Sequence, residues 1–269
     1  MKKERCMLFF DIDGTLITTD GKRTFPDSAK RALREARKRG HLVYINTGRV
    51  MANVDDFIRE VVFEGYVCGC GTYIVSEGEV LLHHRIPQVR CREIAYKCRE
   101  CRMMAIFEHT EHTGYDNELA GEDAGYQEIL RYFKSMGRNI IESIEDPAFC
   151  FDKFACWYEE GNPKLQEFID YMSQDFTCIQ REGNFLEVVP QGFSKATGIR
   201  FLMEKYNIPL ERVYAFGDSN NDLDMLRYVQ NSIAMGVCTE EVAEAASYRT
   251  DTVEADGIEK AMRHLGIIE

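Results

Sequence analysis

The most constraining feature of this chain is a short apolar run, residues 7–10, that stops abruptly at two carboxylates. Asp11 and Asp13 follow the run, separated by one isoleucine, and Gly14 comes next. Four apolar residues bounded by such a turn predict a buried strand of a parallel sheet. In an open α/β sheet, ligands bind just beyond the carboxyl ends of such strands. The strand period of two would point Asp11 and Asp13 in the same direction.

This acidic strand end has two interpretations. Two like charges at a strand tip are costly unless a cation or a shared proton offsets them, which favours a ligand site. A solvated turn is the simpler interpretation, because aspartate and glycine are common turn formers. The rest of the chain decides between them.

The overall charge and hydropathy limit the classes of partner. The 269 residues carry a formal net charge of −12, and the basic residues do not cluster. Nucleic acids and anionic membranes are therefore disfavoured, whereas Mg²⁺ is compatible with such a surface. No apolar stretch approaches membrane-spanning length, and residues 1–6 lead into the first strand without a signal peptide. We expect a cytoplasmic protein, a monomer or a homodimer, of one large or two modest domains.

The ten cysteines predict buried free thiols rather than a disulfide scaffold, because the chain is long and shows no secretory signal. Cys98 and Cys101 have metal-like spacing, but no second pair of cysteines or histidines completes four ligands. Cys91 falls on the same helical face as these two, as a core residue does. Cys68 and Cys70 form an equally incomplete set. A zinc site built on these cysteines is therefore disfavoured.

Strand and helix alternate after the acidic turn. A helix is predicted over about 26–39 and ends at Gly40, and a second strand over 41–45 runs into the polar residues 46–49. Another helix is predicted over about 51–61. This β-α-β-α order favours an α/β fold, with a Rossmann-like parallel sheet and helices on both faces.

The same rhythm returns near the C-terminus. Ser194 is predicted to cap a helix that reaches about Tyr206. A strand over 212–216 then ends in the polar cluster 217–222. A strand over 232–235, another helix, and a last helix over about 258–265 complete the pattern.

Between these two parts the pattern changes to that of an α+β insert with a small core of its own. We predict a core domain formed by residues 1–82 and 190–269, with residues 83–189 as the inserted domain. The core elements before the insert are short strands over 66–68, 73–75 and 80–82. The elements predicted within it are helices over 89–101 and 163–174, strands over 103–107 and 153–158, an irregular polar stretch over 108–116, and a hairpin that turns at Glu182, Gly183 and Asn184.

Polar residues stand at the carboxyl ends of three predicted strands and at the start of one helix. They are Asp11 and Asp13, Thr47, Asp218, and Lys195. In a parallel sheet these ends converge on one crevice. Three carboxylates with hydroxyl and amide oxygens suit Mg²⁺, and helix N-termini beside them favour an anion. A cation site beside an anion site is what phosphoryl transfer requires.

Each of these residues has a simpler interpretation when it is considered alone. Lys195 in a first helical turn is normally a solvated cation, and Thr47 before a glycine is normally a turn residue. Asp218 and Asp222 are suited to capping a helix and stabilising its dipole. Only the joint pattern favours a functional site.

Four motifs in order resemble those of the haloacid dehalogenase superfamily. They are Asp11-Ile12-Asp13-Gly14-Thr15-Leu16, Asn46-Thr47-Gly48-Arg49, Lys195 within residues 192–198, and Gly217-Asp218-Ser219-Asn220-Asn221-Asp222. Specifically, the chain resembles the Cof-type phosphatases, type IIB, which carry a large α/β cap inserted between the second and third motifs. The resemblance covers essentially the whole length and implies that residues 83–189 are a cap that selects the substrate.

The resemblance implies a chemical role for three residues. Asp11 would be the nucleophile that forms an aspartyl-phosphate. Asp13 would be the acid that protonates the leaving oxygen and then the base that activates water. Lys195 would hold Asp11 and neutralise the phosphoryl group. Such a cation is needed, because two unit charges of like sign about 4 Å apart repel by roughly 4 kcal/mol at an effective dielectric constant near 20.

The resemblance also implies two sets of binding residues. The phosphoryl group would be bound by Thr47, Gly48, Asn221 and Lys195. The cofactor, Mg²⁺, would be bound by Asp11, the backbone carbonyl of Asp13, and Asp218. Asp222 would act through water or on Lys195.

The insert contains residues that the motifs do not assign. Its polar stretch would face the substrate if the insert acts as a lid. His109 and His112 in this stretch are metal-ligand types, but exposed loop histidines are the commoner case. The chain also has Cys70-Gly71 where the resembled family commonly has Asn-Gly, so substrate contacts at that loop do not transfer to it.

The combined pattern predicts a Mg²⁺-dependent phosphatase that acts on a small phosphorylated metabolite. A sugar phosphate is favoured, with nucleotide-derived and pyridoxal phosphates as further options. Two alternatives stay open. A phosphomutase would retain phospho-Asp11 long enough to return the phosphoryl group, and a regulator would bind a phosphorylated ligand without turnover. The intact set of Asp11, Asp13, Lys195 and Asp218 favours the phosphatase.

Overall fold

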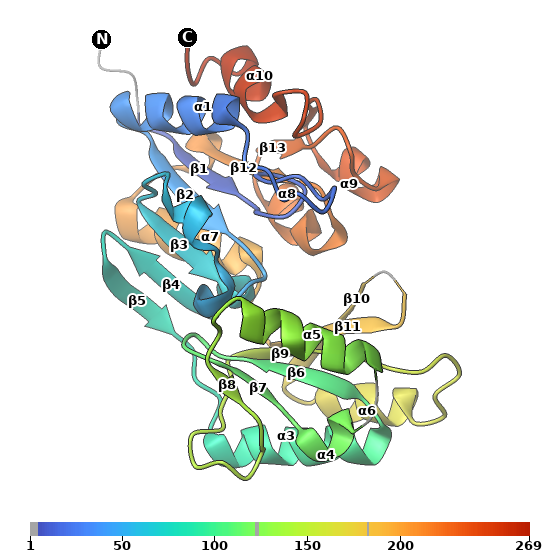
Figure 1. The fold of residues 1–269 in the computed structure, drawn as a ribbon. Helices are drawn as coiled ribbons and strands as arrows, with labels where there is room; N and C mark the ends of the chain where they lie inside the picture. The colour runs from blue at the N-terminus through green and yellow to red at the C-terminus, as the bar shows by residue number, and fades with distance from the viewer. Residues whose placement is uncertain (1–4, 122–123, 182) are drawn as a thin grey trace. The chain divides into compact units, whose positions relative to one another are not determined.

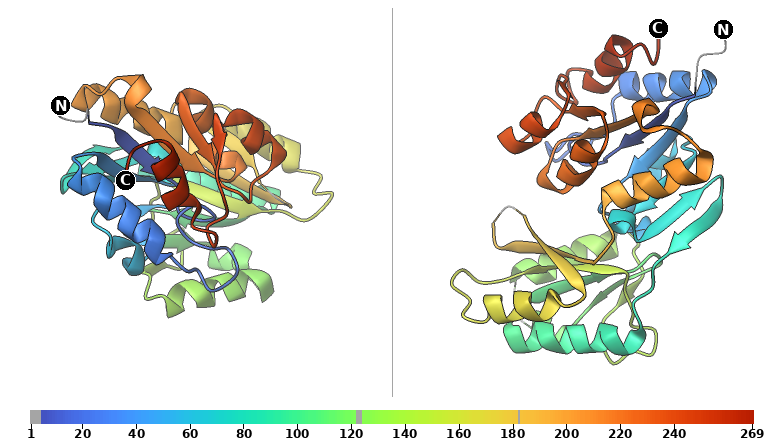
Figure 2. Two further views of the ribbon diagram at one scale, coloured as in Figure 1. Left: turned by 90° about the horizontal axis from the view of Figure 1, so that it is seen from above. Right: turned by 180° about the vertical axis from the view of Figure 1, so that it is seen from behind.

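The chain forms two compact units (Figures 1 and 2). We define the core unit and the inserted unit by their residues. The computed structural model describes residues 5–121, 124–181 and 183–269. The core unit comprises Met1–Gly48, Asp55–Leu82 and Phe193–Glu269. The inserted unit comprises Arg49–Val54 and His83–Gly192.

The core unit is built on a sheet that is parallel over most of its width. Among the described residues, eight strands are neighbours in the order β14-β13-β12-β1-β2-β3-β4-β5. The pairings from β14 to β3 are parallel, and β4 runs antiparallel to β3. The predicted α/β fold with a parallel sheet is therefore confirmed. The strands are β1 Met7–Phe10, β2 Leu42–Asn46, β3 Gly65–Cys68, β4 Tyr73–Ser76, β5 Glu79–His83, β12 Val213–Gly217, β13 Asn231–Ala234 and β14 Tyr248–Arg249.

Helices cover both faces of this sheet. Helix α1 contacts α10 on one face, and α7 contacts α8 on the other (Figure 2). None of the helices that the structure describes, in either unit, is long and apolar enough to cross a membrane. The helices of the core unit are α1 Asp27–Lys38, α2 Asp56–Arg59, α7 Lys195–Tyr206, α8 Leu223–Tyr228, α9 Glu240–Ala245 and α10 Gly257–His264. Short 3₁₀ turns are η2 Gly69–Gly71, η3 Leu210–Arg212 and η4 Asn220–Asp222.

Strand β1 lies in the middle of the sheet because both of its faces are apolar. Its four residues are fully buried, as expected for a strand covered on both sides. Met7 and Phe9 pack against residues of α7 and α8. Phe10 points to the other face, where its ring stacks on Phe216 of β12 with centroids 4.4 Å apart. The parallel register places the chain segments that follow β1, β2 and β12 at one edge of the sheet.

The inserted unit has its own, mostly antiparallel sheet. Its order over the described residues is β10-β11-β9-β6-β7-β8, and only β7 and β8 pair in parallel. The strands are β6 Met104–Glu108, β7 Thr113–Tyr115, β8 Ile140–Ile141, β9 Lys153–Trp157, β10 Phe176–Gln180 and β11 Phe185–Pro190. The helices are α3 Gln88–Cys101, α4 Asn117–Ala120, α5 Ala124–Ser135 and α6 Leu165–Met172, with the 3₁₀ turn η1 Met51–Asn53.

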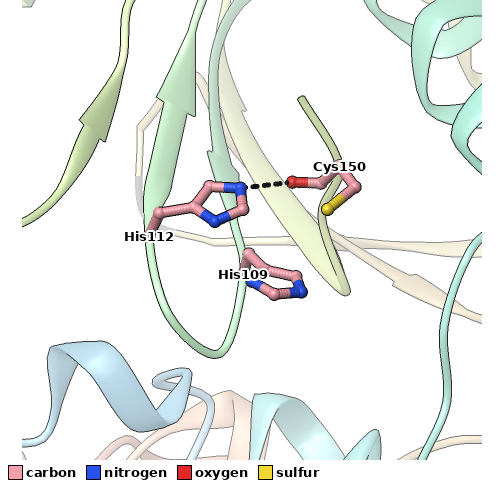
Figure 3. Close-up of side chains that lie close together, drawn as sticks. All are labelled: His109, His112 and Cys150. Atoms are coloured by element: carbon pink, nitrogen blue, oxygen red, sulfur yellow. Dashed lines mark hydrogen bonds between the residues drawn. The ribbon is translucent and has the colours of Figure 1, made fainter. Parts of the chain in front are cut away.

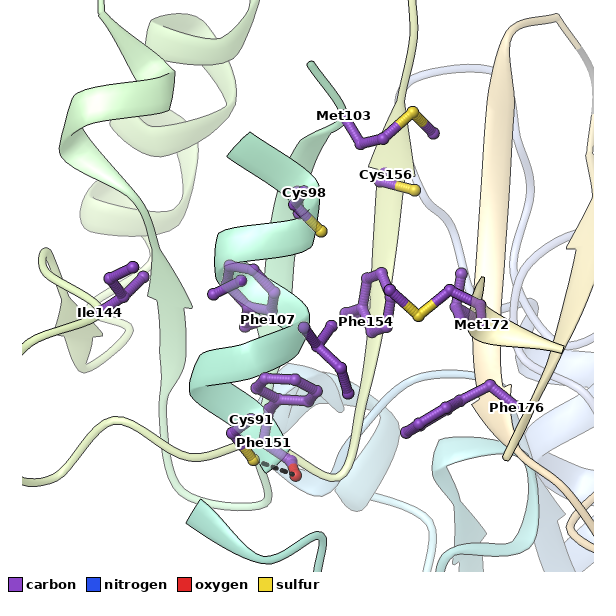
Figure 4. Packing of buried hydrophobic residues seen from close by; sticks show 14 of the residues in the cluster. Cys91, Cys98, Met103, Phe107, Ile144, Phe151, Phe154, Cys156, Met172 and Phe176 are labelled. Carbon is purple, nitrogen blue, oxygen red and sulfur yellow. Dashed lines mark hydrogen bonds between the residues drawn. The ribbon is translucent and has the colours of Figure 1, made fainter. Parts of the chain in front are cut away.

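Aromatic and sulfur-containing side chains fill the core of the inserted unit (Figure 4). The ring centroid of Phe107 lies 4.9 Å from that of Phe151. Cys91, Cys98 and Cys101 of α3 are fully buried in the same cluster. All ten cysteines of the chain are free thiols, as predicted. Most of them are also buried, as predicted, and the others are partly exposed.

One predicted helix is wrong. The range 51–61 contains the turn η1 and the short helix α2, separated by two extended residues. The Arg49 side chain donates to the carbonyl oxygen of Asn53 at 3.0 Å, and Asp55 pairs with Arg23 at 2.5 Å. The apolar spacing is compatible with one helix, but these two side-chain contacts hold the chain extended between the two turns.

Three further details differ from the sequence pattern or lie outside the described residues. Strand β7 lies inside the stretch that is predicted to be irregular, where pairing with β6 overrides its polar composition. The edge strand β14 has two residues, too few to show a periodicity. In the predicted hairpin turn, Glu182 lies outside the described residues; β10 and β11 on its two sides pair in the antiparallel direction.

Phe9→Ala is expected to lower the free energy of unfolding by about 3–5 kcal/mol. The substitution removes a fully buried ring that stacks on Tyr44 and leaves a cavity. Chemical denaturation followed by circular dichroism measures the change. The control is Val237→Ala, at a side chain that is 70 % exposed, which should change stability by less than about 0.5 kcal/mol. A loss below about 1 kcal/mol for Phe9→Ala would contradict a central position of β1.

Candidate active site

The centre of the site is a buried lysine between two carboxylates. Lys195 Nζ lies 2.7 Å from Asp11 Oδ1 and 2.5 Å from Asp222 Oδ1. The side chains of Lys195 and Asp222 are 0 % exposed, and that of Asp11 is 6 % exposed. Because a buried charge is tolerated only when it is paired and hydrogen-bonded, the three groups form one electrostatic unit. This unit joins the end of β1, the start of α7 and the loop after β12.

Helix α7 is held at the site by contacts to its first turn. Ser194 and Thr197 form a capping box, in which each side chain accepts the other residue's backbone N–H. The predicted cap is therefore confirmed. Asn46 Nδ2, at the end of β2, donates to the carbonyl oxygen of Lys195 at 3.1 Å. Gly71 adopts φ of +92°, and a Cβ there would lie 2.5 Å from the Ser194 carbonyl oxygen, which explains the glycine at this position.

The loop after β12 is folded around the Asp222 carboxylate. Asp222 Oδ2 accepts the backbone N–H groups of Asp218 at 2.9 Å and Ser219 at 3.0 Å. Its other oxygen, Oδ1, accepts from Lys195. A Cβ at Gly217 would lie 2.6 Å from the Asp222 Cβ, so only glycine allows this approach. Both oxygens of Asp222 are thus engaged in positioning the loop and the lysine.

Asp218 faces the first motif. Its Oδ1 accepts from the Thr15 hydroxyl at 2.8 Å. Gly14 adopts φ of +78°, and a Cβ on it would overlap the Asp218 carboxylate. Position 14 therefore needs glycine for two reasons: the left-handed backbone and the close approach of a carboxylate.

Three carboxylates share this small space. Oxygens of Asp11, Asp218 and Asp222 lie within 4.8 Å of one another. Burial raises the pKa of Asp11 to about 7; Lys195 opposes the change, and Asp222 and Asp13 add to it. Burial, and then the charge of Asp11, raises the pKa of Asp218 to about 8. Burial lowers the pKa of Lys195, but Asp11 and Asp222 outweigh it, so the pKa is raised and the ammonium stays charged.

The donor set fits a hard divalent cation. One lysine does not neutralise three carboxylates. Burial, to which the charges of neighbouring carboxylates add, raises the pKa of Asp11 and of Asp218. Carboxylate oxygens are the ligands that Mg²⁺ prefers. Asp222 and one oxygen of Asp11 are engaged with Lys195 and the loop. The Asp218 carboxylate, and the lone pair that Asp11 Oδ1 keeps beside its bond from Lys195, are therefore compatible with binding a cation.

Asp13 differs from Asp11 in exposure. Strand β1 ends at Phe10 and the chain then turns, with the Gly14 N–H donating to the Ile17 carbonyl oxygen at 2.9 Å. The strand alternation itself therefore does not reach Asp13, and the shared direction of Asp11 and Asp13 stays a prediction. Asp11 is buried, whereas Asp13 is exposed.

The remaining predicted residues lie in segments that follow β2 and β12. Thr47 is buried, and its backbone bonds to β3 and η2. Gly48 and Asn221 are half-buried, and Asn221 Oδ1 accepts from the Ser219 hydroxyl at 2.7 Å. The sheet register places Thr47 at the same edge as Asp11. Contact of these residues with a phosphoryl group stays a prediction.

Two positioning residues were not predicted individually, Thr15 and Asn46. Both stand inside recognised motifs, which was the only signal available. Their partners, Asp218 and the backbone of Lys195, are 203 and 149 residues away along the chain. A pattern of neighbouring residues does not specify partners at such separations.

Comparison with known proteins identifies the family. Residues 8–262 match the family described as haloacid dehalogenase-like hydrolase. This chain belongs to that family. The matched range contains the network from Asp11 to Asp222, and the resemblance inferred from the four motifs is therefore confirmed.

Individual haloacid dehalogenase relatives span nearly the whole chain. YkrA of Bacillus subtilis, provisionally named a phosphatase, is 28% identical over 271 residues and covers 98% of both chains. YcsE of the same organism, named a 5-amino-6-(5-phospho-D-ribitylamino)uracil phosphatase, is 25% identical over 261 residues, covering 96% of this chain and 94% of its own. The solved structure of BT4131, named a HAD subclass IIB sugar phosphatase, is 28% identical with a TM-score of 0.80 and covers 98% of this chain and 100% of its own.

These similarities settle the reaction class at a coarse level. The chain is a hydrolase of the haloacid dehalogenase family, of the phosphatase class. Its architecture, a parallel-sheet core with an inserted α+β unit, is the one expected for subclass IIB.

Mg²⁺ is expected to raise the melting temperature more at pH 8.5 than at pH 6. The pKa values of Asp11 and Asp218 are about 7 and about 8, above the ordinary 3.8. Stability from these groups is therefore full at low pH and is lost as pH rises through 7–8, where both carboxylates ionise and repel. A divalent cation binds the ionised form, so its stabilising effect grows over the same range. Thermal unfolding at each pH, with and without Mg²⁺, measures this change in melting temperature.

Asp218→Asn should remove most of this Mg²⁺ effect because it deletes one of the two carboxylates proposed as ligands. The control is Asp56→Asn, at a side chain that is 100% exposed. An equal Mg²⁺ effect at the two pH values, or an undiminished effect in Asp218→Asn, would contradict a cation site at these carboxylates.

Proposed function

We propose that this chain is a Mg²⁺-dependent phosphatase that hydrolyses a small phosphorylated metabolite through a phospho-Asp11 intermediate. The observation that carries the proposal is the buried pairing of Lys195 with Asp11 and Asp222, beside Asp218. A nucleophile, a cation and further carboxylates from three distant parts of the chain meet at one edge of the sheet. The cytoplasmic location stays a prediction from the sequence.

Asp11 is the proposed nucleophile because one of its oxygens is fixed. Lys195 donates to Asp11 Oδ1 at 2.7 Å, which orients the carboxylate and leaves Oδ2 for attack on phosphorus. As the bond between Asp11 and phosphorus forms, the bond from phosphorus to the ester oxygen breaks. Lys195 also stabilises the negative charge that develops on the phosphoryl oxygens.

Asp13 is the proposed acid and base because it is exposed and lies two residues from the nucleophile. In the first step its carboxylic acid gives a proton to the leaving ester oxygen, so the alcohol departs neutral. In the second step its carboxylate takes a proton from the water that attacks phosphorus. The bond between phosphorus and Asp11 then breaks, inorganic phosphate leaves, and Asp11 returns to the carboxylate.

Thr47, Gly48, Asn221 and Lys195 are proposed to bind the phosphoryl group. The first two follow β2 and Asn221 lies in η4, which leads into α8. The Thr47 hydroxyl and the Asn221 amide are the kinds of donor that orient phosphoryl oxygens without adding charge. Their position after parallel strands of one sheet supports this assignment.

Asp11, Asp218 and the Asp13 backbone carbonyl are proposed to hold Mg²⁺. Bound there, the ion would offset the charge of the carboxylates and of the phosphate dianion. Thr15 orients Asp218 for this role, and Asp222 acts on Lys195 rather than on the ion. We assign the metal-binding role to Asp218 and not to Asp222 because hydrogen bonds already occupy the Asp222 carboxylate.

A sugar phosphate is the favoured substrate class. BT4131 is named a sugar phosphatase, and YcsE is named for a substrate with a phosphorylated ribityl chain. Both of these named substrate types carry phosphate on a polyhydroxylated carbon chain. We propose that the inserted domain, predicted over residues 83–189, acts as a cap that selects the part of the substrate beyond the phosphate.

The purified protein with Mg²⁺ is expected to release phosphate from at least one sugar phosphate, in a panel that includes nucleotide and pyridoxal phosphates. EDTA should abolish release, and Asp11→Asn should lower kcat by about 10⁴-fold or more because it removes the nucleophile. Asp56→Asn is the exposed control and should keep the wild-type rate. Conversion of a sugar phosphate to an isomer without phosphate release would instead indicate a mutase, and tight binding without turnover a regulator.

Asp13→Asn should slow hydrolysis of the phosphorylated enzyme by about 10²–10⁴-fold, because asparagine cannot take a proton from water. With an aryl phosphate, whose leaving group needs no proton, the first step should persist. A burst of released phenol and a mass increase of one phosphoryl group on the protein would then appear together. Wild-type turnover of alkyl phosphates by Asp13→Asn would rule out this role.

A further inference from the structure

A group of histidine, cysteine and aspartate side chains gathers in the inserted unit, and none of them is proposed for catalysis. His83 ends β5, His109 and His112 lie on the connection between β6 and β7, and Cys150 and Asp152 precede β9. Figure 3 shows His109, His112 and Cys150 close together, the two rings on the connection and the thiol on the neighbouring segment. Segments far apart in the chain thus supply one cluster.

The potential ligand atoms are close enough for one ion. A ring nitrogen of His109, a ring nitrogen of His112 and Cys150 Sγ lie within 4.8 Å of one another. His83, His109 and Asp152 meet the same limit, so His109 belongs to both groups. Tetrahedral zinc with bonds of about 2.0–2.3 Å holds its ligand atoms about 3.3–3.8 Å apart. Small side-chain rotations that move these ligand atoms by about 1 Å would therefore bring them to the spacing of a tetrahedral zinc site.

The hydrogen bond of His112 determines which nitrogen can bind a metal. His112 Nε2 lies 3.0 Å from the carbonyl oxygen of Cys150. A carbonyl oxygen only accepts, so Nε2 carries the proton and Nδ1 has the lone pair. Metal-binding histidines typically donate their other N–H to such an oxygen, which fixes the tautomer and the orientation of the ring. The same bond ties His112 to the residue that supplies the thiol.

His109 has the same tautomer. The Glu111 backbone N–H donates to His109 Nδ1 at 3.2 Å, so this nitrogen has the lone pair. The His109 ring stacks on that of His112, with centroids 4.3 Å apart and an interplanar angle of 25°. Binding a metal through Nδ1 would replace one exposed backbone hydrogen bond, and water can then satisfy the Glu111 N–H.

The protonation states also suit a metal. Burial lowers the pKa of both His109 and His112, which keeps the rings neutral near pH 7. Neutral imidazole is the form that binds metal ions. Burial raises the pKa of the Cys150 thiol, so a bound ion must displace its proton, as it does for every thiolate ligand.

The donor types distinguish this cluster from the carboxylates of the core unit. Two imidazoles and a thiol favour a transition-metal ion of intermediate softness, such as Zn²⁺, over the hard ion Mg²⁺. Asp152 Oδ1 accepts from His83 Nε2 at 2.8 Å, and Oδ2 accepts from the Thr110 hydroxyl at 2.7 Å and N–H at 2.9 Å. Asp152 thus holds the connection that carries both histidines beside the segment that carries Cys150.

We propose that His109, His112 and Cys150 form a site for Zn²⁺ or a similar transition-metal ion, with water in the fourth position. The site is independent of the proposed phosphatase mechanism. A bound ion would cross-link the β6–β7 connection to the segment before β9 and so rigidify this end of the inserted unit.

The test uses the full chain, freed of metal by a chelator and titrated with Co²⁺. Binding should produce a thiolate-to-Co²⁺ charge-transfer band in the near ultraviolet that saturates at one ion per chain. Added Zn²⁺ should displace Co²⁺ and remove the band. Carboxylate ligands give no such band, so Co²⁺ at the core unit does not contribute. Absence of the band in the wild-type protein would overturn the proposal.

Cys150→Ser should abolish the band, and His112→Gln should weaken Co²⁺ binding at least about tenfold. Asp218→Asn and Cys178→Ser are the controls and should keep the band, since neither residue belongs to the cluster. Circular dichroism of the metal-free variants checks their folding. Should Cys150→Ser not fold, His112→Gln decides, because its amide retains an N–H donor for the Cys150 carbonyl. An unchanged band in Cys150→Ser, or unchanged affinity in His112→Gln, would overturn the proposal.

Discussion

The active site depends on one buried ammonium group. Lys195 is fully buried and lies between Asp11 and Asp222, which come from separate parts of the chain. A buried charge without partners costs several kcal/mol, so each of the three groups requires the other two. Because Asp11 ends β1, Lys195 begins α7 and Asp222 follows β12, this requirement also determines where three elements of the core unit meet. The geometry proposed for catalysis is thus a consequence of pairing a buried charge.

Close approach of charged groups explains the small residues around the site. A Cβ at Gly14 would overlap the Asp218 carboxylate, and a Cβ at Gly217 would overlap Asp222. Asn46 donates to the Lys195 carbonyl and so positions the helix that carries the ammonium group. Three carboxylates still share one lysine, and burial together with the charges of neighbouring carboxylates raises the pKa of Asp11 and Asp218. The same excess of negative charge makes the site suitable for a divalent cation.

The inserted unit shows how tertiary contacts change the meaning of a residue. His112 stands in a polar stretch and was expected to be an exposed loop residue, yet it is only 7 % exposed. The reason is that β7 begins at the next residue and pairs with β6, which brings His112 against the backbone of Cys150. The metal site proposed there rests on this juxtaposition, and no spacing of histidines and cysteines in the sequence indicates it.

The sequence by itself determined the α/β order, the buried strand before Asp11 and the four motifs, because these depend on residues close together in the chain. The cap at Ser194 was predictable for the same reason. Only the tertiary structure decided which groups pair. Lys195 and Asp11 are 184 residues apart, and Thr15 and Asp218 are 203 residues apart. It also decided the break after η1, where side-chain contacts prevail over helical periodicity. Periodicity reports local conformation, whereas charge pairing and burial depend on residues that only the fold brings together.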